Sequence, residues 1–288
     1  MLRQRLPIGI ALILIFVSIL WVDGKTAPYH PIWIGLVTLL SILASLELQH
    51  LLAKSIATPY AYLMTACSAA CLFSNIFSAA SGLNGPLSFS PVAITFCFSL
   101  AAILVTGVQE FDDMQPIMPR LASTVFGVAY VGILGSFLAQ IRFLNGPEQG
   151  AFALALLIGV TKGTDTGAYT FGKIFGRHLM TPKLSPKKTW EGAIGGLIFA
   201  VLMAQIITSL EIAIRGQATL ESLPARLIFA ITVSIAGQLG DLAESLIKRE
   251  AHLKDASTVI PGFGGVLDLL DSLFLAAPVG WAILTILR

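Results

Sequence analysis

Two aspartates three residues apart, Asp268 and Asp271, stand at the start of the last hydrophobic segment of the chain. Residues with this spacing share one face of a helix, so both carboxylates are predicted to point the same way. The preceding hydrophobic segment carries a polar stripe with helical spacing, formed by Asp241, Glu244, Ser245 and Lys248. A helix–loop–helix hairpin would bring Asp241 to the two later aspartates. Such a carboxylate set suits a hard divalent cation such as Mg²⁺, which favours oxygen ligands.

Side chains that could hold phosphate lie close to these acids in the sequence. They are Ser185, Lys187, Lys188, Lys248, Arg249 and Lys254. Lys187 and Lys188 precede a predicted helix, where the lysines and the free backbone amides would together stabilise an anion. Two adjacent lysines are also an ordinary topology signal on a cytosolic loop. Acids for a metal and lysines for phosphate are the combination expected for phosphoryl or nucleotidyl transfer.

Charged residues inside the predicted membrane spans also include Lys162, Asp165 and Glu47. Lys162 and Asp165 are three apart, so on a helix they could neutralise one another. A lone charge at the bilayer centre costs at least about 2.5 to 3.5 kcal/mol, so such residues normally face a polar cavity or pair with each other. Glu47 is the third, in the predicted span 31–48, where a carboxylate is equally costly.

The composition determines which elements must position these residues. Of 288 residues, 56% are hydrophobic and 12% are charged, and the mean hydropathy is +0.84. These values predict an all-α integral membrane protein. The net charge of +2 is too small and too scattered to indicate nucleic-acid binding. With about 20 apolar residues per span, we predict about nine transmembrane helices, roughly at 6–22, 31–48, 60–80, 89–108, 121–141, 150–171, 190–210, 224–247 and 265–287.

The lysines and arginines predict the orientation. Most of them fall in loops that are cytosolic if the N-terminus is cytosolic, as the positive-inside rule requires. The acidic residues would then face the cytosol from a multi-pass protein of the inner cell membrane. We expect one membrane domain, in which residues 1–155 form structural or dimerisation spans and residues 156–288 form the catalytic region.

Three motifs in the second half are typical of one family. The run SLIKREAHLKDASTVIPGFGGVLDLLDS, residues 245–272, resembles the signature of the phosphatidate cytidylyltransferases, also called CDP-diacylglycerol synthases. The stretches DTGAYTFGKIFGRH and SPKKTWEG match two further family motifs in the same order. The resemblance covers residues 159–288. Two positions depart from the pattern, with Phe263 where His is usual and Leu269 where Arg is usual, while the acidic and lysine positions are kept.

The resemblance implies a reaction, its cofactor and the roles of the site residues. CMP would pass from CTP to phosphatidic acid, giving CDP-diacylglycerol and pyrophosphate, with Mg²⁺ as cofactor, alone or with a second cation. The implied metal ligands are Asp241, Asp268 and Asp271, and Asp165 would support the cavity. The implied phosphate-binding residues are Lys248, Arg249 and Lys254 for the triphosphate, and Ser185, Lys187 and Lys188 for the lipid or nucleotide phosphate. Asp241, Asp268, Lys248 and Lys254 would be the catalytic residues, in a membrane-embedded homodimer.

Two other functions are compatible with parts of this pattern. A CTP-dependent lipid kinase of the polyprenol type would share the metal site and the basic loop, but it would transfer the γ-phosphate. An ion-coupled transporter would also use intramembrane charges, commonly with an inverted repeat. The first half contains no segment that matches PGFGGVLDLLDS, and this disfavours the transporter.

Overall fold

The computed structural model describes residues 14–83, 85–144, 146–257 and 264–287. A helix at Leu14–Gly24 comes first. The elements that follow are α2 (Pro31–Ser55), α3 (Ala61–Phe73), α4 (Asn75–Ala80), η1 (Gly85–Phe89), α5 (Ser90–Gln109), α6 (Met118–Gly127), η2 (Val128–Ile133), α7 (Leu134–Arg142), α8 (Pro147–Phe175), β1 (Leu179–Thr181), β2 (Ser185–Thr189), α9 (Trp190–Arg215), α10 (Leu223–Glu250) and α11 (Val266–Ile286). The fold is therefore almost entirely helical.

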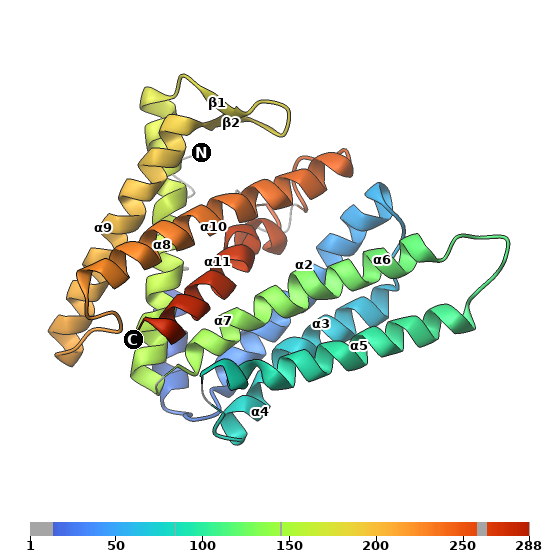
Figure 1. The fold of residues 1–288 in the computed structure, drawn as a ribbon, viewed down its shortest axis with the longest axis horizontal. Helices are drawn as coiled ribbons and strands as arrows, with labels where there is room; N and C mark the ends of the chain where they lie inside the picture. Colours follow the sequence, from blue (N-terminus) through green and yellow to red (C-terminus); the bar gives the residue numbers. More distant parts are fainter. Residues whose placement is uncertain (1–13, 84, 145, 258–263, 288) are drawn as a thin grey trace.

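The helices form two groups joined by a central pair (Figure 1). The first half of the chain supplies α2, α3, α5 and the continuous helix formed by α6, η2 and α7. At the opposite edge, α8 and α9 lie side by side, and α10 and α11 cross between the two groups. The carboxylate-bearing helices therefore occupy the middle of the molecule.

Seven described segments are long and apolar enough to cross a membrane. They are Pro31–Ser55, Ala61–Ser78, Gly85–Gln109, Met118–Arg142, Trp190–Arg215, Leu223–Glu250 and Val266–Ile286. Each corresponds to a predicted span. The predicted span 150–171 forms α8, a helix whose charged residues make it less apolar than these seven. Of the predicted span 6–22, residues 14–22 belong to the helix Leu14–Gly24, and residues 6–13 lie outside the described residues. Nine spans and a cytosolic N-terminus stay predictions.

The starts of α9 and α10 follow from local capping. The Thr189 hydroxyl accepts a hydrogen bond from the Gly192 amide, and the Ser222 hydroxyl accepts one from the Ala225 amide. Each satisfies a backbone donor that has no partner within its helix. Pro224 stands in the first turn of α10, where its fixed φ fits a helix and its missing N–H costs nothing.

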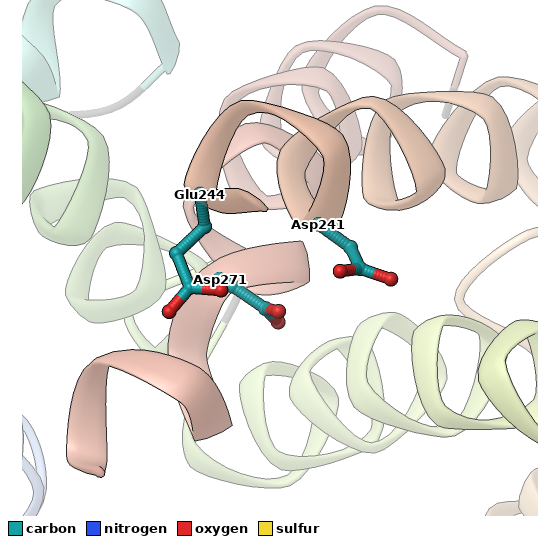
Figure 2. Close-up of side chains that lie close together, drawn as sticks. All are labelled: Asp241, Glu244 and Asp271. Atoms are coloured by element: carbon teal, nitrogen blue, oxygen red, sulfur yellow. The ribbon is translucent and has the colours of Figure 1, made fainter. Parts of the chain in front are cut away.

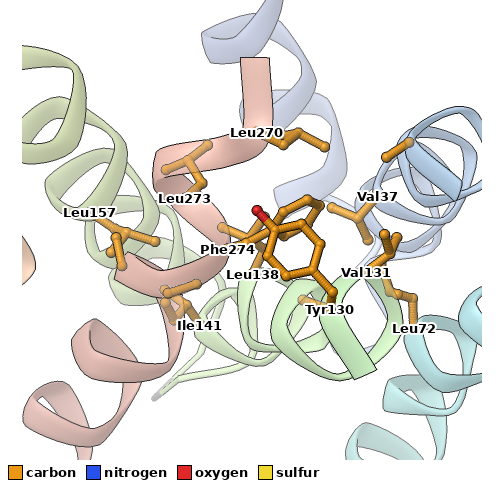
Figure 3. Packing of buried hydrophobic residues seen from close by; sticks show 14 of the residues in the cluster. Val37, Leu72, Tyr130, Val131, Leu138, Ile141, Leu157, Leu270, Leu273 and Phe274 are labelled. Carbon is orange, nitrogen blue, oxygen red and sulfur yellow. The ribbon is translucent and has the colours of Figure 1, made fainter. Parts of the chain in front are cut away.

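The α11 helix packs against both groups of helices through a core of apolar side chains (Figure 3). Leu270, Leu273 and Phe274 of α11 lie among buried residues of the first half, and the Phe274 ring meets Tyr130 edge-on at 5.3 Å between centroids. Leu157 of α8 belongs to the same buried cluster. Since α11 contacts both groups, its position depends on both.

A two-stranded hairpin interrupts the helical fold between α8 and α9. Strands β1 and β2 pair antiparallel, with Leu179 opposite Thr189 and Thr181 opposite Ser185. The hairpin projects from one end of the α8–α9 pair (Figure 1). The all-α expectation left it out, because this polar stretch lacks the apolar alternation that indicates a strand in sequence.

Glycines let α8 and α9 approach closely. A Cβ placed on Gly167 of α8 would lie 2.5 Å from the Gly195 carbonyl oxygen and 2.7 Å from Phe199 Cβ on α9. Backbone carbonyls cannot move aside as a flexible side chain can. Small residues at such positions are the usual means of helix packing in membranes, where burying apolar surface gives little driving force.

Replacing Gly167 with Ala is therefore expected to destabilise the folded protein, by about 1 to 3 kcal/mol for an overpacked contact. Gly35 of α2 provides the matched control, because a Cβ there meets nothing within 4 Å. Gly35→Ala should be neutral or slightly stabilising, since Ala favours a helix over Gly. Thermal unfolding of both variants in detergent would measure the difference. Equal melting temperatures for the two would contradict the packing argument.

Candidate active site

Three carboxylates converge where α10 meets α11. Each of Asp241, Glu244 and Asp271 has a carboxylate oxygen within 4.8 Å of an oxygen of the other two. Figure 2 shows Asp241 and Glu244 extending from α10 and Asp271 from α11, on the same side of the helix pair. Glu244 is 0% exposed and Asp271 is 7% exposed. We call these three residues the carboxylate cluster.

The close approach of α10 to α11 brings the carboxylate cluster together. Gly240 immediately precedes Asp241, and a Cβ on it would lie 2.6 Å from the Asp271 carbonyl oxygen. Any larger residue would hold the two backbones apart at this point. The three-residue spacing of Asp241 and Glu244 then turns both side chains toward α11.

Glu244 is buried and has Lys248 as its ion-pair partner. The Lys248 ammonium lies 2.5 Å from Glu244 Oε2, while Glu244 Oε1 has no hydrogen-bond partner among the described residues. A buried carboxylate oxygen without a donor is costly, and a cation beside it would lower that cost.

Lys248 also joins the carboxylate cluster to Asp268. Its Nζ atom lies 2.6 Å from Asp268 Oδ1, while Asp268 Oδ2 accepts hydrogen bonds from the amides of Ala256, at 3.1 Å, and Gly265, at 2.7 Å. Asp268 is thus occupied with a lysine and two backbone donors, and it lies outside the carboxylate cluster. Of the three metal ligands expected from the sequence, the fold brings Asp241 and Asp271 together and adds Glu244.

Two more lysines approach the carboxylate cluster from other elements. Lys188 of β2 lies 2.8 Å from Asp241 Oδ2. Lys162 of α8 lies 3.1 Å from Asp165 Oδ2, and it also interacts electrostatically with Asp241 and Asp271. With Lys248, three ammonium groups from α8, β2 and α10 surround the three carboxylates. The Lys162–Asp165 pair predicted from its spacing forms.

The β1–β2 hairpin positions Lys188 beside Asp241. Its base is tied to the start of α9, where Glu191 accepts hydrogen bonds from the Arg177 and His178 amides and contacts His178 Nδ1 at 2.5 Å. Side chains alternate along β2, so Lys187 is exposed while Lys188 is partly buried. Of the two adjacent lysines, Lys188 is therefore the one that contacts the carboxylate cluster.

The remaining predicted residues lie around the same opening. Ser185 begins β2 and is partly buried, and Lys254 is exposed in the loop after α10. Arg249 is exposed, and its Nε donates to the Leu184 carbonyl at 3.4 Å, which links the end of α10 to the hairpin turn. Leu269 is partly buried in the first turn of α11. Phe263 lies outside the described residues.

One contributor from the first half was not anticipated. Tyr130 belongs to the π-helix η2, and its ring packs edge-on against Phe274 of α11, three residues after Asp271. Its hydroxyl is buried and has no hydrogen-bond partner among the described residues. Short π-helical turns often occur at functional sites, but nothing in a run of apolar residues marks one. Glu244, by contrast, was visible in the polar stripe.

The arrangement fits a hard divalent cation. Three carboxylates at this spacing supply the oxygen ligands that Mg²⁺ uses, and the buried Glu244 Oε1 atom, which has no hydrogen-bond donor among the described residues, is what a cation would satisfy. The surrounding lysines could neutralise the phosphates of a substrate held by the same ion. The site can thus bind a metal–polyphosphate complex beside the membrane-spanning helices.

Comparison with known proteins gives a consistent family assignment. The sequence model described as the cytidylyltransferase family matches residues 3–287. Phosphatidate cytidylyltransferase of Haemophilus influenzae is 35% identical over 186 residues, which are 63% of this chain and 63% of that protein. The protein of the same name from Staphylococcus saprophyticus is 35% identical over 189 residues, 65% of each chain. That from Mycobacterium leprae is 36% identical over 166 residues, 58% of this chain and 50% of the relative. The chain thus spans less than two thirds of the length of these relatives.

Proposed function

We propose that this chain transfers CMP from CTP to phosphatidic acid and releases pyrophosphate, because it belongs to the cytidylyltransferase family. The observation that carries the proposal is the carboxylate cluster with its three lysines, which offers both a cation site and phosphate-binding charges. The relatives that bear the name phosphatidate cytidylyltransferase support this choice of substrates.

The three members of the carboxylate cluster would hold Mg²⁺, with Asp268 acting through Lys248. A bound Mg²⁺ would supply a positive charge that neutralises and orients the phosphates of CTP. The sequence expectation assigned Asp268 as a direct ligand, and its contacts instead support a role in orienting Lys248.

The basic residues have distinct places around this centre. Lys188 and Lys248 contact the acids directly, and in this proposal they would bind the triphosphate. Lys187, Arg249 and Lys254 are exposed, where they would attract an anionic substrate from the aqueous side. A phosphate oxygen of phosphatidic acid would form a bond to the α-phosphorus of CTP. The bond from that phosphorus to the bridging oxygen would break, and its electron pair would leave with pyrophosphate.

The site suits one lipid and one water-soluble substrate. The carboxylate cluster lies toward the start of α11 and near the end of α10, so the reaction would take place at the mouth of the membrane helices. Phosphatidic acid could keep its acyl chains in the bilayer while CTP arrives from water. We place this mouth on the cytosolic side of the inner membrane, in a homodimer, from the charge distribution and the family resemblance.

A product assay tests the proposal directly. Purified protein in detergent would be incubated with phosphatidic acid, Mg²⁺ and CTP labelled at the α-phosphate. We expect label in the lipid fraction, one pyrophosphate released per labelled lipid, and no transfer when Mg²⁺ is chelated. A parallel reaction would contain γ-labelled CTP and a polyprenol. Transfer of the γ-label to the polyprenol, without α-label in phosphatidic acid, would replace the proposal with the kinase alternative.

A further inference from the structure

Glu47, in the first half of the chain, reaches the start of α11. Its Oε1 atom accepts hydrogen bonds from the Val266 amide at 3.0 Å and from the Ser257 hydroxyl at 2.6 Å. Its Oε2 atom accepts one from the Leu267 amide at 2.7 Å. Within the described residues no basic side chain forms an ion pair with Glu47, so its charge is stabilised by these three donors.

We propose that Glu47 is a positioning residue, which fixes the start of α11 and thereby holds Asp271 in register with Asp241 and Glu244. The inference rests on the proposed function only in assigning the carboxylate cluster to catalysis. It gives the N-terminal spans a specific part in the site, beyond completing the fold.

The donors that Glu47 satisfies are those that a helix start leaves without partners. Val266 and Leu267 are the first two residues of α11, after the N-cap Gly265, and their N–H groups have no acceptor within the helix. The positive end of the helix dipole favours a carboxylate at this position. Hydrogen bonds from backbone N–H groups to a charged carboxylate are also stronger than neutral ones. Glu47 therefore caps α11 from another helix.

This cap acts on the carboxylate cluster through the backbone of α11. Leu267 precedes Asp271 by four residues, about 6 Å along the helix axis. A shift or fraying of the first turn would move Asp271 relative to the two acids of α10. Ligand and catalytic groups must be held within about 0.5 Å of their working geometry, so loss of the cap should impair the site while leaving the bundle folded.

Gly265 allows this contact. A Cβ at that position would lie 2.4 Å from Glu47 Oε2 and 2.7 Å from Glu47 Cδ. The backbone of Gly265 is extended, with φ −93° and ψ 177°, so alanine can adopt it without strain. Gly265→Ala would therefore act by displacing the Glu47 carboxylate, which gives a second way to remove the cap.

The test measures backbone exchange and kinetics on the full chain. Hydrogen–deuterium exchange of peptides covering residues 264–270 should quicken about tenfold or more in Glu47→Gln and in Gly265→Ala, because the amides lose an anionic acceptor, while peptides of α8 and α9 stay unchanged. The Mg²⁺ concentration for half-maximal activity should rise at least about tenfold. Glu110→Gln is the matched control, since Glu110 is exposed and pairs with Arg120 away from α11.

A double variant separates the cap from general effects of substitution. In a Glu47→Ala background, Gly265→Ala should add nothing to the exchange rate or to the Mg²⁺ dependence, because the carboxylate it displaces is gone. Unchanged exchange at 264–270 in Glu47→Gln would overturn the proposal. If exchange at residues 264–270 quickens in Glu47→Gln but the wild-type protein transfers no CMP, the cap is supported and the proposed function is refuted.

Discussion

Asp271→Asn is expected to lower the rate of CMP transfer on the order of 10²- to 10³-fold, the loss typical when one electrostatic stabiliser of a transition state is removed. The amide keeps the size of the side chain but removes a charge from the carboxylate cluster. It also introduces an N–H₂ donor where a cation would bind. Asp271 Oδ1 accepts a hydrogen bond from the Ser272 hydroxyl at 2.8 Å, and an amide oxygen can retain it, so α11 should stay folded.

The measurement is initial rate against Mg²⁺ concentration for wild-type protein and Asp271→Asn, with the melting temperature of each. Asp113→Asn is the control, because it makes the same chemical change at an exposed position outside the site. Activity of Asp271→Asn within twofold of wild type, at every Mg²⁺ concentration, would show that the carboxylate cluster is not the catalytic centre.

Lys248→Met is expected to lower both stability and activity. Lys248 lies 2.5 Å from Glu244 and 2.6 Å from Asp268, and its own side chain is only 12% exposed. Methionine has a similar shape without the charge, so it would leave the buried Glu244 and the partly buried Asp268 without their cation. Breaking a buried ion pair in this way costs about 3 to 5 kcal/mol. Chemical unfolding in mixed detergent micelles, together with the transfer assay, would measure both losses.

A double variant tests how Asp268 acts. If Asp268 works through Lys248, the losses of transfer activity in Lys248→Met and Asp268→Asn should overlap, and the double variant should be little worse than Lys248→Met. If Asp268 is a direct metal ligand, as the sequence resemblance implies, Asp268→Asn should raise the required Mg²⁺ concentration as strongly as Asp271→Asn. Fully additive losses would contradict the indirect role.

The local patterns of the sequence predicted much of this architecture. Long apolar segments predicted the membrane helices, because an apolar run of that length has few other stable environments. Helical spacing predicted that Asp241, Glu244 and Lys248 share a face, and that Lys162 pairs with Asp165. The family motifs then indicated which residues belong to one site, and the family assignment is confirmed by the match over residues 3–287.

The distances between helices could not be predicted from the sequence. Which acid joins the carboxylate cluster depends on how α10 crosses α11, and this crossing depends on the packing at Gly240 and at Phe274. In the same geometry Asp268 contacts Lys248 and accepts hydrogen bonds from two backbone amides. Helical periodicity gives the direction of a side chain around its own helix and says nothing of what the facing helix presents there.

By itself, the sequence determined the membrane class, the polar faces of the helices and the chemistry that their side chains can perform. All three follow from residue type and short-range spacing. Only the tertiary structure decided that Glu244 faces Asp271, that Lys188 rather than Lys187 meets Asp241, and that Glu47 caps a helix more than 200 residues away. Each of these contacts joins elements distant in the chain, and their separation is set by the packing of the whole bundle.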